Sequence, residues 1–153
     1  MRIVQLQDPP AIRAVTRTVL ETLTEWFEDE TAREQYIEQS GEQVVFAAFQ
    51  KERPIGFVCL RSTGKDTVEL AVMGVLGVYH GQGVGSRLVE RARVWAKENG
   101  YSFMQVKTVR MGVYESYDRT NRFYQKLGFK EFEVMPALWD EWNPCQIYIM
   151  SVG

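Results

Sequence analysis

Three glycines at alternating positions are the residues of this chain whose type and spacing point most directly to chemistry. Gly81, Gly83 and Gly85 follow an apolar run and precede an amphipathic helical pattern. Glycine lacks the β-carbon that would hold a ligand away from the main chain. The amides of such a turn, at the start of a helix, converge where the helix dipole is positive. The segment Val75–Ser86 therefore predicts a site that binds a phosphate or pyrophosphate through the main chain.

The glycine spacing separates this turn from two common phosphate-binding motifs. A P-loop ends in Gly-Lys-Ser/Thr, whereas Gly85 is followed by Ser86 and Arg87. A dinucleotide-binding turn reads Gly-x-Gly-x-x-Gly and opens a βαβ unit, whereas this turn has a shorter last interval and lies in mid-chain. Taken alone, the segment leaves a plain strand-to-helix turn as an alternative.

A second motif lies further along the chain. Residues Tyr117–Phe129 predict a short helix that ends with Gly128 at its C′ position, followed by a strand. With this motif the sequence resembles the GNAT superfamily of acyl-CoA-dependent N-acetyltransferases. His80–Gly85 is similar to that family's phosphate turn, Arg/Gln-x-x-Gly-x-Gly/Ala, and Phe123–Phe129 is similar to its Phe/Leu-Tyr-x-x-x-Gly-Phe block. The two motifs have the family's order and separation, and the resemblance covers roughly residues 43 to 150.

The resemblance implies a fold, an activity and a cosubstrate. We expect one GNAT-like domain over residues 1–153, with a mixed, mostly antiparallel central sheet of about six to seven strands and helices on both faces. The implied enzyme transfers an acetyl group from acetyl-CoA to a primary amine of a small molecule or peptide, by direct attack. The implied main-chain contacts to the cosubstrate come from Val75, beside pantetheine, and from the turn residues Gly81, Gln82, Gly83, Val84, Gly85 and Ser86.

The resemblance also implies that Tyr124 assists the leaving group. A phenol with a pKa of about 10 would lose roughly 2 kcal/mol in transferring its proton fully to a thiolate with a conjugate-acid pKa of about 8.5. Tyr124 is therefore expected to stabilise the sulfur by a hydrogen bond, with complete transfer only if its pKa falls. The alternative is a core aromatic residue, because Thr120, Tyr124 and Leu127 share one helical face.

Glu69 is the candidate base, because some members of the family keep a glutamate on the strand that leads to the turn. A lysine-type acceptor has a pKa of about 10.4, so populating its neutral form at pH 7 costs roughly 4.6 kcal/mol. An ordinary carboxylate is a feeble base, so Glu69 would have to be partly buried. A water chain is the alternative base, and an outward strand residue beside Asp66 is the alternative reading of Glu69.

The sequence departs from the family pattern at three positions. His80 replaces the usual Arg or Gln, which removes one expected side-chain aid to phosphate binding. Gly77 replaces a frequent proline, and Tyr117 replaces a frequent asparagine near pantetheine. The main-chain amides of the turn are unaffected by these changes.

Two aromatic and acidic clusters are candidates for the amine acceptor. They are Trp26-Phe27-Glu28-Asp29 and Trp139-Asp140-Glu141-Trp142. Acidic groups with aromatic walls suit a cationic amine. Helix-end and loop packing is the alternative, and the exposed tryptophans could equally form the face of a homodimer.

The composition bounds the class of protein. The chain has 153 residues, 45% of them hydrophobic, which suits one domain with a buried core. Its net charge of −2 argues against a nucleic-acid partner held by bulk electrostatics. The single histidine excludes a multi-histidine metal site, and no metal is expected. No apolar segment resembles a signal core or a membrane span, so we expect a cytoplasmic protein with no membrane partner. Cys59 and Cys145 lie in apolar runs and are expected to be buried thiols.

Periodicity predicts the elements that position these residues. Asp8 should cap a first helix that has Pro9 at its first position. The other expected elements are strands at 2–6, 43–50, 55–61, 68–76, 103–109, 129–134 and 146–150, and helices along an apolar stripe from Ile12 to Phe27, over 30–39, from Val84 until Asn99-Gly100, and up to Gly128.

Two other functions remain open at this stage. A non-catalytic acyl-CoA-binding sensor or partner-binding module would use the same turn without turnover. A nucleotide-binding protein would use only the glycine turn.

Overall fold

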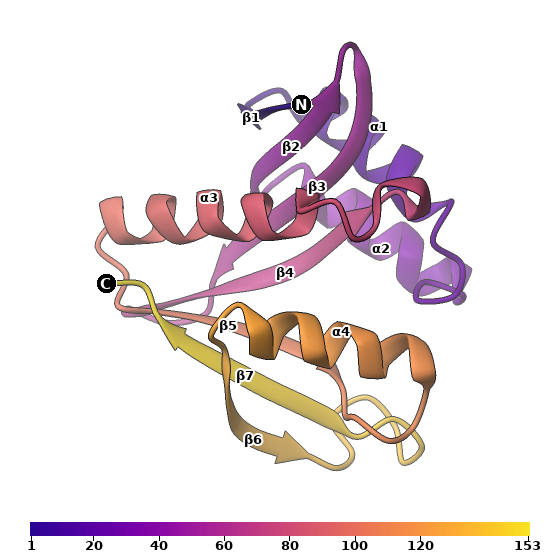
Figure 1. Ribbon diagram of the computed structural model, residues 1–153, viewed down its shortest axis with the longest axis vertical. Coiled ribbons are helices and arrows are strands. Elements are labelled where there is room, and N and C mark those ends of the chain that lie inside the picture. The colour runs from indigo at the N-terminus through magenta and orange to yellow at the C-terminus, as the bar shows by residue number, and fades with distance from the viewer. The chain divides into compact units, whose positions relative to one another are not determined.

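The computed structural model describes residues 1–153 as seven strands and four α-helices, with one short 3₁₀ helix (Figure 1). The elements in chain order are β1 (Arg2–Leu6), α1 (Pro9–Leu20), α2 (Glu30–Ser40), β2 (Val44–Gln50), β3 (Arg53–Ser62), β4 (Thr67–Val75), the 3₁₀ helix η1 (Gly77–Tyr79), α3 (Val84–Glu98), β5 (Phe103–Val109), α4 (Glu115–Lys126), β6 (Lys130–Met135) and β7 (Cys145–Ser151). The strands form one mixed sheet with the order β1-β2-β3-β4-β5-β7-β6. The predicted fold class is confirmed.

The chain divides into two compact units. Unit 1 comprises residues 1–61 and 71–95, and unit 2 comprises residues 62–70 and 96–153. Strand β4 contributes to both, because its residues up to Leu70 belong to unit 2 and those from Ala71 onward belong to unit 1.

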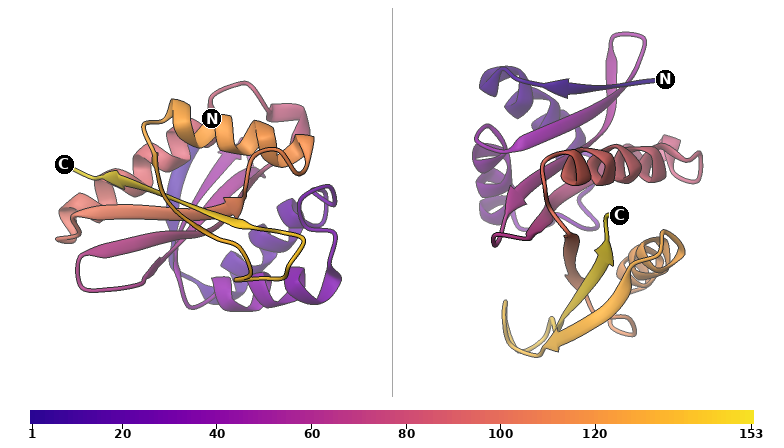
Figure 2. Two further views of the ribbon diagram at one scale, coloured as in Figure 1. Left: turned by 90° about the horizontal axis from the view of Figure 1, so that it is seen from below. Right: turned by 90° about the vertical axis from the view of Figure 1, so that its left-hand side faces the viewer.

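Unit 1 is a sheet with helices on both faces (Figure 2). Strand β2 pairs antiparallel with both β1 and β3. Glycines let the two helices approach the strands closely. A β-carbon built at Gly74 would lie 2.8 Å from Leu23 Cδ1, just beyond α1, whereas one at Gly56 would lie 3.2 Å from Leu88 Cδ1 of α3. Helices α1 and α3 therefore cover opposite faces of these strands.

Helix α1 begins as the sequence predicts but ends earlier. Asp8 is its N-cap and accepts a hydrogen bond of 3.1 Å from Ala11 N–H. The apolar stripe continues to Phe27, yet the α-helix ends at Leu20. Beyond that point Thr22 N–H and Leu23 N–H donate to carbonyls three residues back, the tighter pattern of a 3₁₀ turn. Leu23 still reaches the core at 6% exposure, so the apolar periodicity outlasts the helix.

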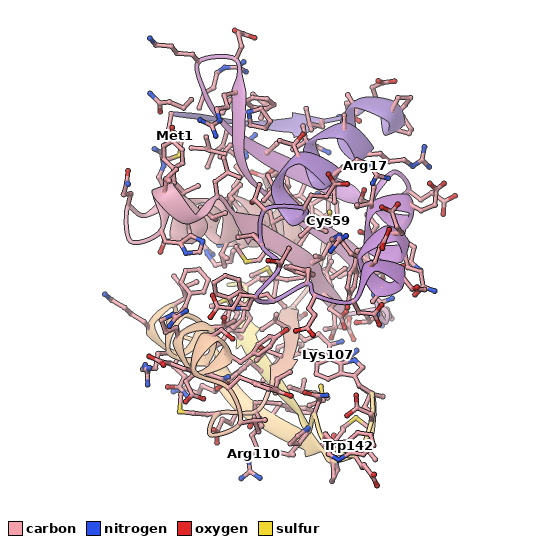
Figure 3. The ribbon with its side chains drawn as sticks, turned by 90° about the vertical axis from the view of Figure 1, so that its right-hand side faces the viewer. Met1, Arg17, Cys59, Lys107, Arg110 and Trp142 are labelled. Atoms are coloured by element: carbon pink, nitrogen blue, oxygen red, sulfur yellow. The ribbon has the colours of Figure 1, made fainter.

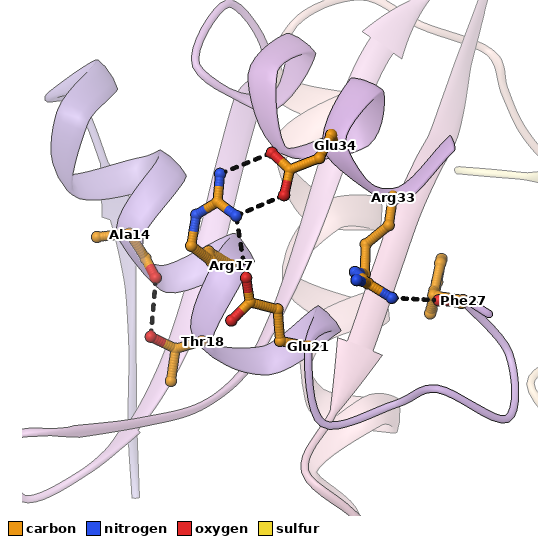
Figure 4. A network of polar contacts seen from close by, with 7 residues as sticks. All are labelled: Ala14, Arg17, Thr18, Glu21, Phe27, Arg33 and Glu34. Atoms are coloured by element: carbon orange, nitrogen blue, oxygen red, sulfur yellow. Dashed lines mark hydrogen bonds and ion pairs between the residues drawn. The ribbon is translucent and has the colours of Figure 1, made fainter. Parts of the chain in front are cut away.

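An arginine fork ties α1 to α2 (Figure 4). Arg17 donates from both terminal nitrogens to the Glu34 carboxylate, at 2.6 and 2.8 Å, and also to Glu21 at 2.9 Å. These hydrogen bonds raise the pKa of Arg17 and lower that of Glu34. The segment between the two helices carries Trp26 and Phe27, and Arg33 also holds it by donating to the Phe27 carbonyl at 2.9 Å. This acidic and aromatic segment is therefore fixed at both ends.

Unit 2 joins parallel and antiparallel pairing. Strand β4 pairs parallel with β5 from Thr67↔Phe103 to Leu70↔Val106. Strand β7 pairs antiparallel with β5 and with β6. Helix α4 contacts β5, and its Asn121 is hydrogen-bonded to Val109 of β5 and to Tyr148 of β7.

Both cysteines are buried and free, as the sequence predicts. Burial raises the pKa of the Cys145 thiol to about 11 and raises that of Cys59 further. Neither is therefore a thiolate nucleophile near neutral pH. None of the helices is both long and apolar enough to cross a membrane.

Candidate active site

The glycine turn leaves strand β4 and enters helix α3 within unit 1. Leu76 N–H donates to Ile55 O at 2.9 Å, so strand pairing with β3 continues to this point. The 3₁₀ helix η1 follows, and it was not expected from the sequence. Gly81 and Gly83 then take φ values of +77° and +82°, in the left-handed region that favours glycine.

The first turn of α3 presents uncapped amides. The first helical hydrogen bond runs from Arg87 N–H to Gly83 O, at 3.1 Å. The amides of Val84, Gly85 and Ser86 precede that bond and have no acceptor within the helix. Gly83 stands in the N-cap position and has no side chain with which to bind them. N–H groups without an acceptor at the start of a helix are the arrangement that commonly binds an anion, and the anion-binding role of this turn stays a prediction.

Gly81 and Gly83 are favoured because of their left-handed backbone conformation, and not because neighbouring atoms leave too little room for a side chain. A β-carbon built at Gly81 or Gly83 would meet no atom within 4 Å. The open space lies on an exposed turn, where a bound anion could approach the main chain closely. A side chain here would carry the cost of a left-handed backbone and would also occupy that approach.

Two side chains of the turn bind back onto its own main chain. His80 Nε2 donates to Val75 O at 2.6 Å, and Gln82 Nε2 donates to Val78 O at 2.9 Å. The His80 ring also packs edge-on against Trp26, with ring centroids 5.7 Å apart. Neither contact could be predicted from the sequence, because a side chain's hydrogen bond to a carbonyl four or five residues away leaves no sequence pattern.

Tyr124 lies in an aromatic cluster of unit 2. It is 5% exposed, and its ring centroid lies 5.3 Å from Phe123, 5.5 Å from Phe129 and 6.3 Å from Tyr148. Burial raises its pKa well above the ordinary phenol value, and no charge or hydrogen bond contributes to the shift. The hydroxyl is therefore a neutral donor throughout the physiological pH range.

A buried polar network holds the helix that carries Tyr124. Asn121, on the preceding turn of α4, is fully buried and donates to Val109 O at the end of β5, at 2.8 Å. Its carbonyl oxygen accepts from the Tyr148 hydroxyl at 2.7 Å, and Gln125 Nε2 donates to that hydroxyl at 3.0 Å. This network was not predicted from the sequence. An amide at the helical spacing of Tyr117 and Tyr124 was the only signal available.

Glu69 is buried and ion-paired in unit 2. Its side chain is 6% exposed, and Oε1 lies 2.7 Å from Nζ of Lys107. The strand register explains the pair, because Glu69 lies opposite Gln105 and Lys107 is two residues further along β5, on the same face. Glu69 is therefore a buried residue and not the outward strand residue of the alternative interpretation. The counter-charge beside it comes from a residue that the sequence analysis did not consider.

The first acidic and aromatic cluster is partly structural. Asp29 is the N-cap of α2 and accepts from Thr31 N–H at 2.9 Å. The Phe27 ring packs against Tyr36 with centroids 5.9 Å apart. Glu28 remains exposed, so one carboxylate of this segment is available to solvent.

The second cluster, Trp139-Asp140-Glu141-Trp142, likewise combines a carboxylate with a structural role and side chains that are exposed. The Asp140 carboxylate accepts from Trp142 N–H and from Asn143, each at 2.9 Å, and these bonds lower its pKa. Trp139 is 45% exposed and Trp142 is 70% exposed. The loop lies beside the end of β5, because Arg110 N–H donates to Pro144 O at 2.9 Å (Figure 3). No group of three or more histidine, cysteine or acidic side chains in the chain could hold a metal ion.

The chain is thus an α/β protein in which a glycine turn leads from a mixed sheet into a helix whose first amides have no helical acceptor. A sequence model of the acetyltransferase (GNAT) family matches residues 12–129. The match covers more than half of the chain, which therefore belongs to the GNAT family of acetyltransferases and is classed among the acyltransferases.

Solved structures show the same fold. A GNAT-family acetyltransferase from Desulfovibrio desulfuricans superposes with a TM-score of 0.84 and 18% identity, covering 99% of each chain. An aminoglycoside 6'-N-acetyltransferase complexed with coenzyme A gives 0.78 and 19%, covering 100% of this chain and 98% of that one. A GNAT acetyltransferase from Elizabethkingia anophelis with acetyl-CoA bound gives 0.68 and 19%, covering 86% and 88%. No curated protein sequence gives a significant match.

The phosphate-binding turn can be tested with a charge placed at Gly83. Two like charges about 4 Å apart repel by roughly 1 to 4 kcal/mol at a protein surface. Gly83→Asp should therefore weaken coenzyme A binding by about tenfold or more, measured by calorimetry. Gly83→Asn is the matched control, since it has the same shape and tolerates a left-handed backbone without the charge. Equal affinity in the two variants would contradict anion binding at this turn.

Proposed function

We propose that residues 1–153 act as one acetyltransferase domain that transfers an acetyl group from acetyl-CoA to a primary amine of a small molecule or peptide. The observation that carries this proposal is the uncapped start of α3 behind Gly81 and Gly83, in a chain of the GNAT family. Solved structures of the same fold with coenzyme A or acetyl-CoA support the choice of cosubstrate.

The main chain of unit 1 is proposed to bind the cosubstrate. The residues present fit a pyrophosphate, because the amides of Val84, Gly85 and Ser86 have no helical acceptor and the turn before them, Gly81–Gly83, is exposed. The amides of that turn are assigned to the same anion. Pantetheine is assigned to the main chain of Val75, where β4 ends, as an added strand would pair with a sheet edge.

Tyr124 is proposed to donate a hydrogen bond to the sulfur of the leaving group. Its raised pKa makes complete proton transfer to a thiolate costlier than the roughly 2 kcal/mol expected from ordinary pKa values. The same shift keeps the hydroxyl protonated as a donor. As the amine attacks the thioester carbonyl, the carbon–sulfur bond breaks and the electron pair goes to sulfur, where a positioned donor stabilises the growing charge.

Removing the Tyr124 hydroxyl should slow the chemical step. Tyr124→Phe is expected to lower kcat by about a hundred- to a thousandfold, as for the loss of one positioned donor, with the Kd for coenzyme A unchanged. Because the phenol stays protonated below its ordinary pKa of about 10, the pH profile of the variant should keep the wild-type shape over that range. Tyr114→Phe, at a tyrosine that is 45% exposed in the same unit, is the control. A Tyr124→Phe enzyme with wild-type kcat would contradict the role.

Glu69 is proposed as the base that takes the proton of the acceptor amine, directly or through water. Its carboxylate is held in place inside unit 2 by Lys107, whose Nζ lies 2.7 Å from Oε1. Lys107 supplies the counter-charge that a carboxylate with 6% side-chain exposure requires.

Glu69→Gln keeps the shape of the side chain and its ability to accept from Lys107 but removes the base. We expect kcat/KM to fall by about a hundredfold near neutral pH. Activity should recover as the pH rises toward the pKa of the acceptor, because more of the amine is then neutral. Glu133→Gln, at an exposed carboxylate of the same unit, should have no effect. A uniform loss at every pH would instead indicate a structural role for Glu69.

The acceptor is proposed to be a cationic amine. Unit 1 offers the exposed carboxylate Glu28, and unit 2 offers the exposed carboxylate Glu141 beside the indoles of Trp139 and Trp142; each set is suited to a cation. An aminoglycoside 6'-N-acetyltransferase shares the fold, so aminoglycosides belong in the panel beside polyamines and peptides with free α-amines.

The activity itself is tested by incubating the protein with acetyl-CoA and this panel while free thiol is measured. The two buried cysteines give little background in such an assay. Thiol release that depends on an amine is the expected result. Binding of acetyl-CoA without turnover on any amine would favour a non-catalytic acyl-CoA sensor. A rise in Tm with ATP but none with coenzyme A would favour a nucleotide-binding protein.

A further inference from the structure

The carbonyl of Val75 points toward the edge of β4 that faces away from β3. In a strand, the N–H and C=O of one residue point to the same side, and successive residues alternate. Leu76 N–H donates to Ile55 O on β3, so the main-chain groups of Val75 point the opposite way. This is the carbonyl to which pantetheine is assigned above.

The side chain of His80 already occupies this acceptor. His80 Nε2 donates to Val75 O at 2.6 Å, a short hydrogen bond between residues five positions apart in the sequence. The carbonyl can act only as an acceptor, so the Nε2–H form of the ring is fixed. The same ring makes the edge contact with Trp26, at 5.7 Å between ring centroids.

We propose that His80 is a latch on the cosubstrate edge of β4, which the pantetheine arm of coenzyme A must displace from Val75 O. The proposal rests on the proposed function, because it concerns the same main-chain edge. A carbonyl oxygen can accept two hydrogen bonds, but an extended arm lying along the strand and an imidazole ring at 2.6 Å require the same space beside it. Binding of the arm therefore exchanges one N–H donor for another.

The latch also links the cosubstrate edge to the segment between α1 and α2. Trp26 lies in that segment, which Arg17 and Arg33 fix at its two ends. When the imidazole leaves Val75 O, its packing against Trp26 must change as well. Binding of the pantetheine arm at the edge of β4 therefore also alters the packing of the segment that carries the exposed carboxylate of Glu28.

Variants of His80 separate the hydrogen bond from the ring. His80→Ala removes both, His80→Phe keeps a ring beside Trp26 but removes the donor, and His80→Gln keeps an N–H donor at the reach of Nε2. The net value of one hydrogen bond predicts that the Kd for coenzyme A falls by about two- to tenfold in the Ala and Phe variants. The Gln variant should stay close to the wild-type affinity.

A fragment of the cosubstrate provides the control for the pyrophosphate site. The probe is 3′-phosphoadenosine 5′-diphosphate, which carries the phosphates without the pantetheine arm. Its Kd should be the same in the wild type and in all three variants, because it does not reach Val75. If the variants bound the fragment as well as coenzyme A more tightly, the latch would be contradicted. The latch would also be contradicted if only the Ala variant, and not the Phe variant, bound coenzyme A more tightly.

The single histidine of the chain makes the exchange directly observable. In nitrogen-15 spectra, the ring of the free protein should show the Nε2–H form. Its signals should shift on addition of coenzyme A and stay in place with the fragment. If the wild type binds coenzyme A but its ring signals do not move, or the Ala and Phe variants bind no more tightly, the latch is wrong and the proposed function stands. If the wild type does not bind coenzyme A at all, the proposed function fails, and the latch fails with it.

Discussion

One backbone hydrogen bond, from Leu76 N–H to Ile55 O, governs how strand β4 ends. It keeps the last residue of the strand in register with β3, and strand alternation then points the Val75 carbonyl to the opposite edge. The chain can leave the sheet only after this bond, and it does so through η1 and two left-handed glycines into α3. The uncapped amides and the edge carbonyl are both consequences of this exit from the sheet.

In unit 2, the cost of removing polar side chains from water determines how the candidate catalytic residues are held. Burying a charge or a polar group is costly unless it finds a partner. Glu69 accordingly has Lys107, and Asn121 has Val109 O and Tyr148. Tyr124 differs, because burial alone raises its pKa. The donor proposed to act on sulfur is thus held by its aromatic neighbours, and its hydroxyl is kept neutral by the same packing.

Much of the fold could be predicted because apolar periodicity is local. Strands β1 and β5 have the predicted bounds, and the Asp8 cap of α1 and the start of α2 were also correct. The end of α1 was wrong, because Leu23 continues the apolar stripe after the backbone has tightened into a 3₁₀ turn. The 3₁₀ helix η1 was missed because three residues carry too little periodicity to recognise. In the candidate site, the glycine turn could be predicted, whereas the partners of His80 and Glu69 could not.

The sequence by itself determined where the elements lie, which residues of the turn can adopt positive φ, and which family the chain resembles. These properties depend on neighbours along the chain and on residue type. Only the tertiary structure decided that Lys107 faces Glu69, that Asn121 joins β5 to β7, and that His80 occupies the Val75 carbonyl. Each of these contacts depends on strand register or on the path of a turn, because a side chain's partner is set by distance in space and not by distance along the chain.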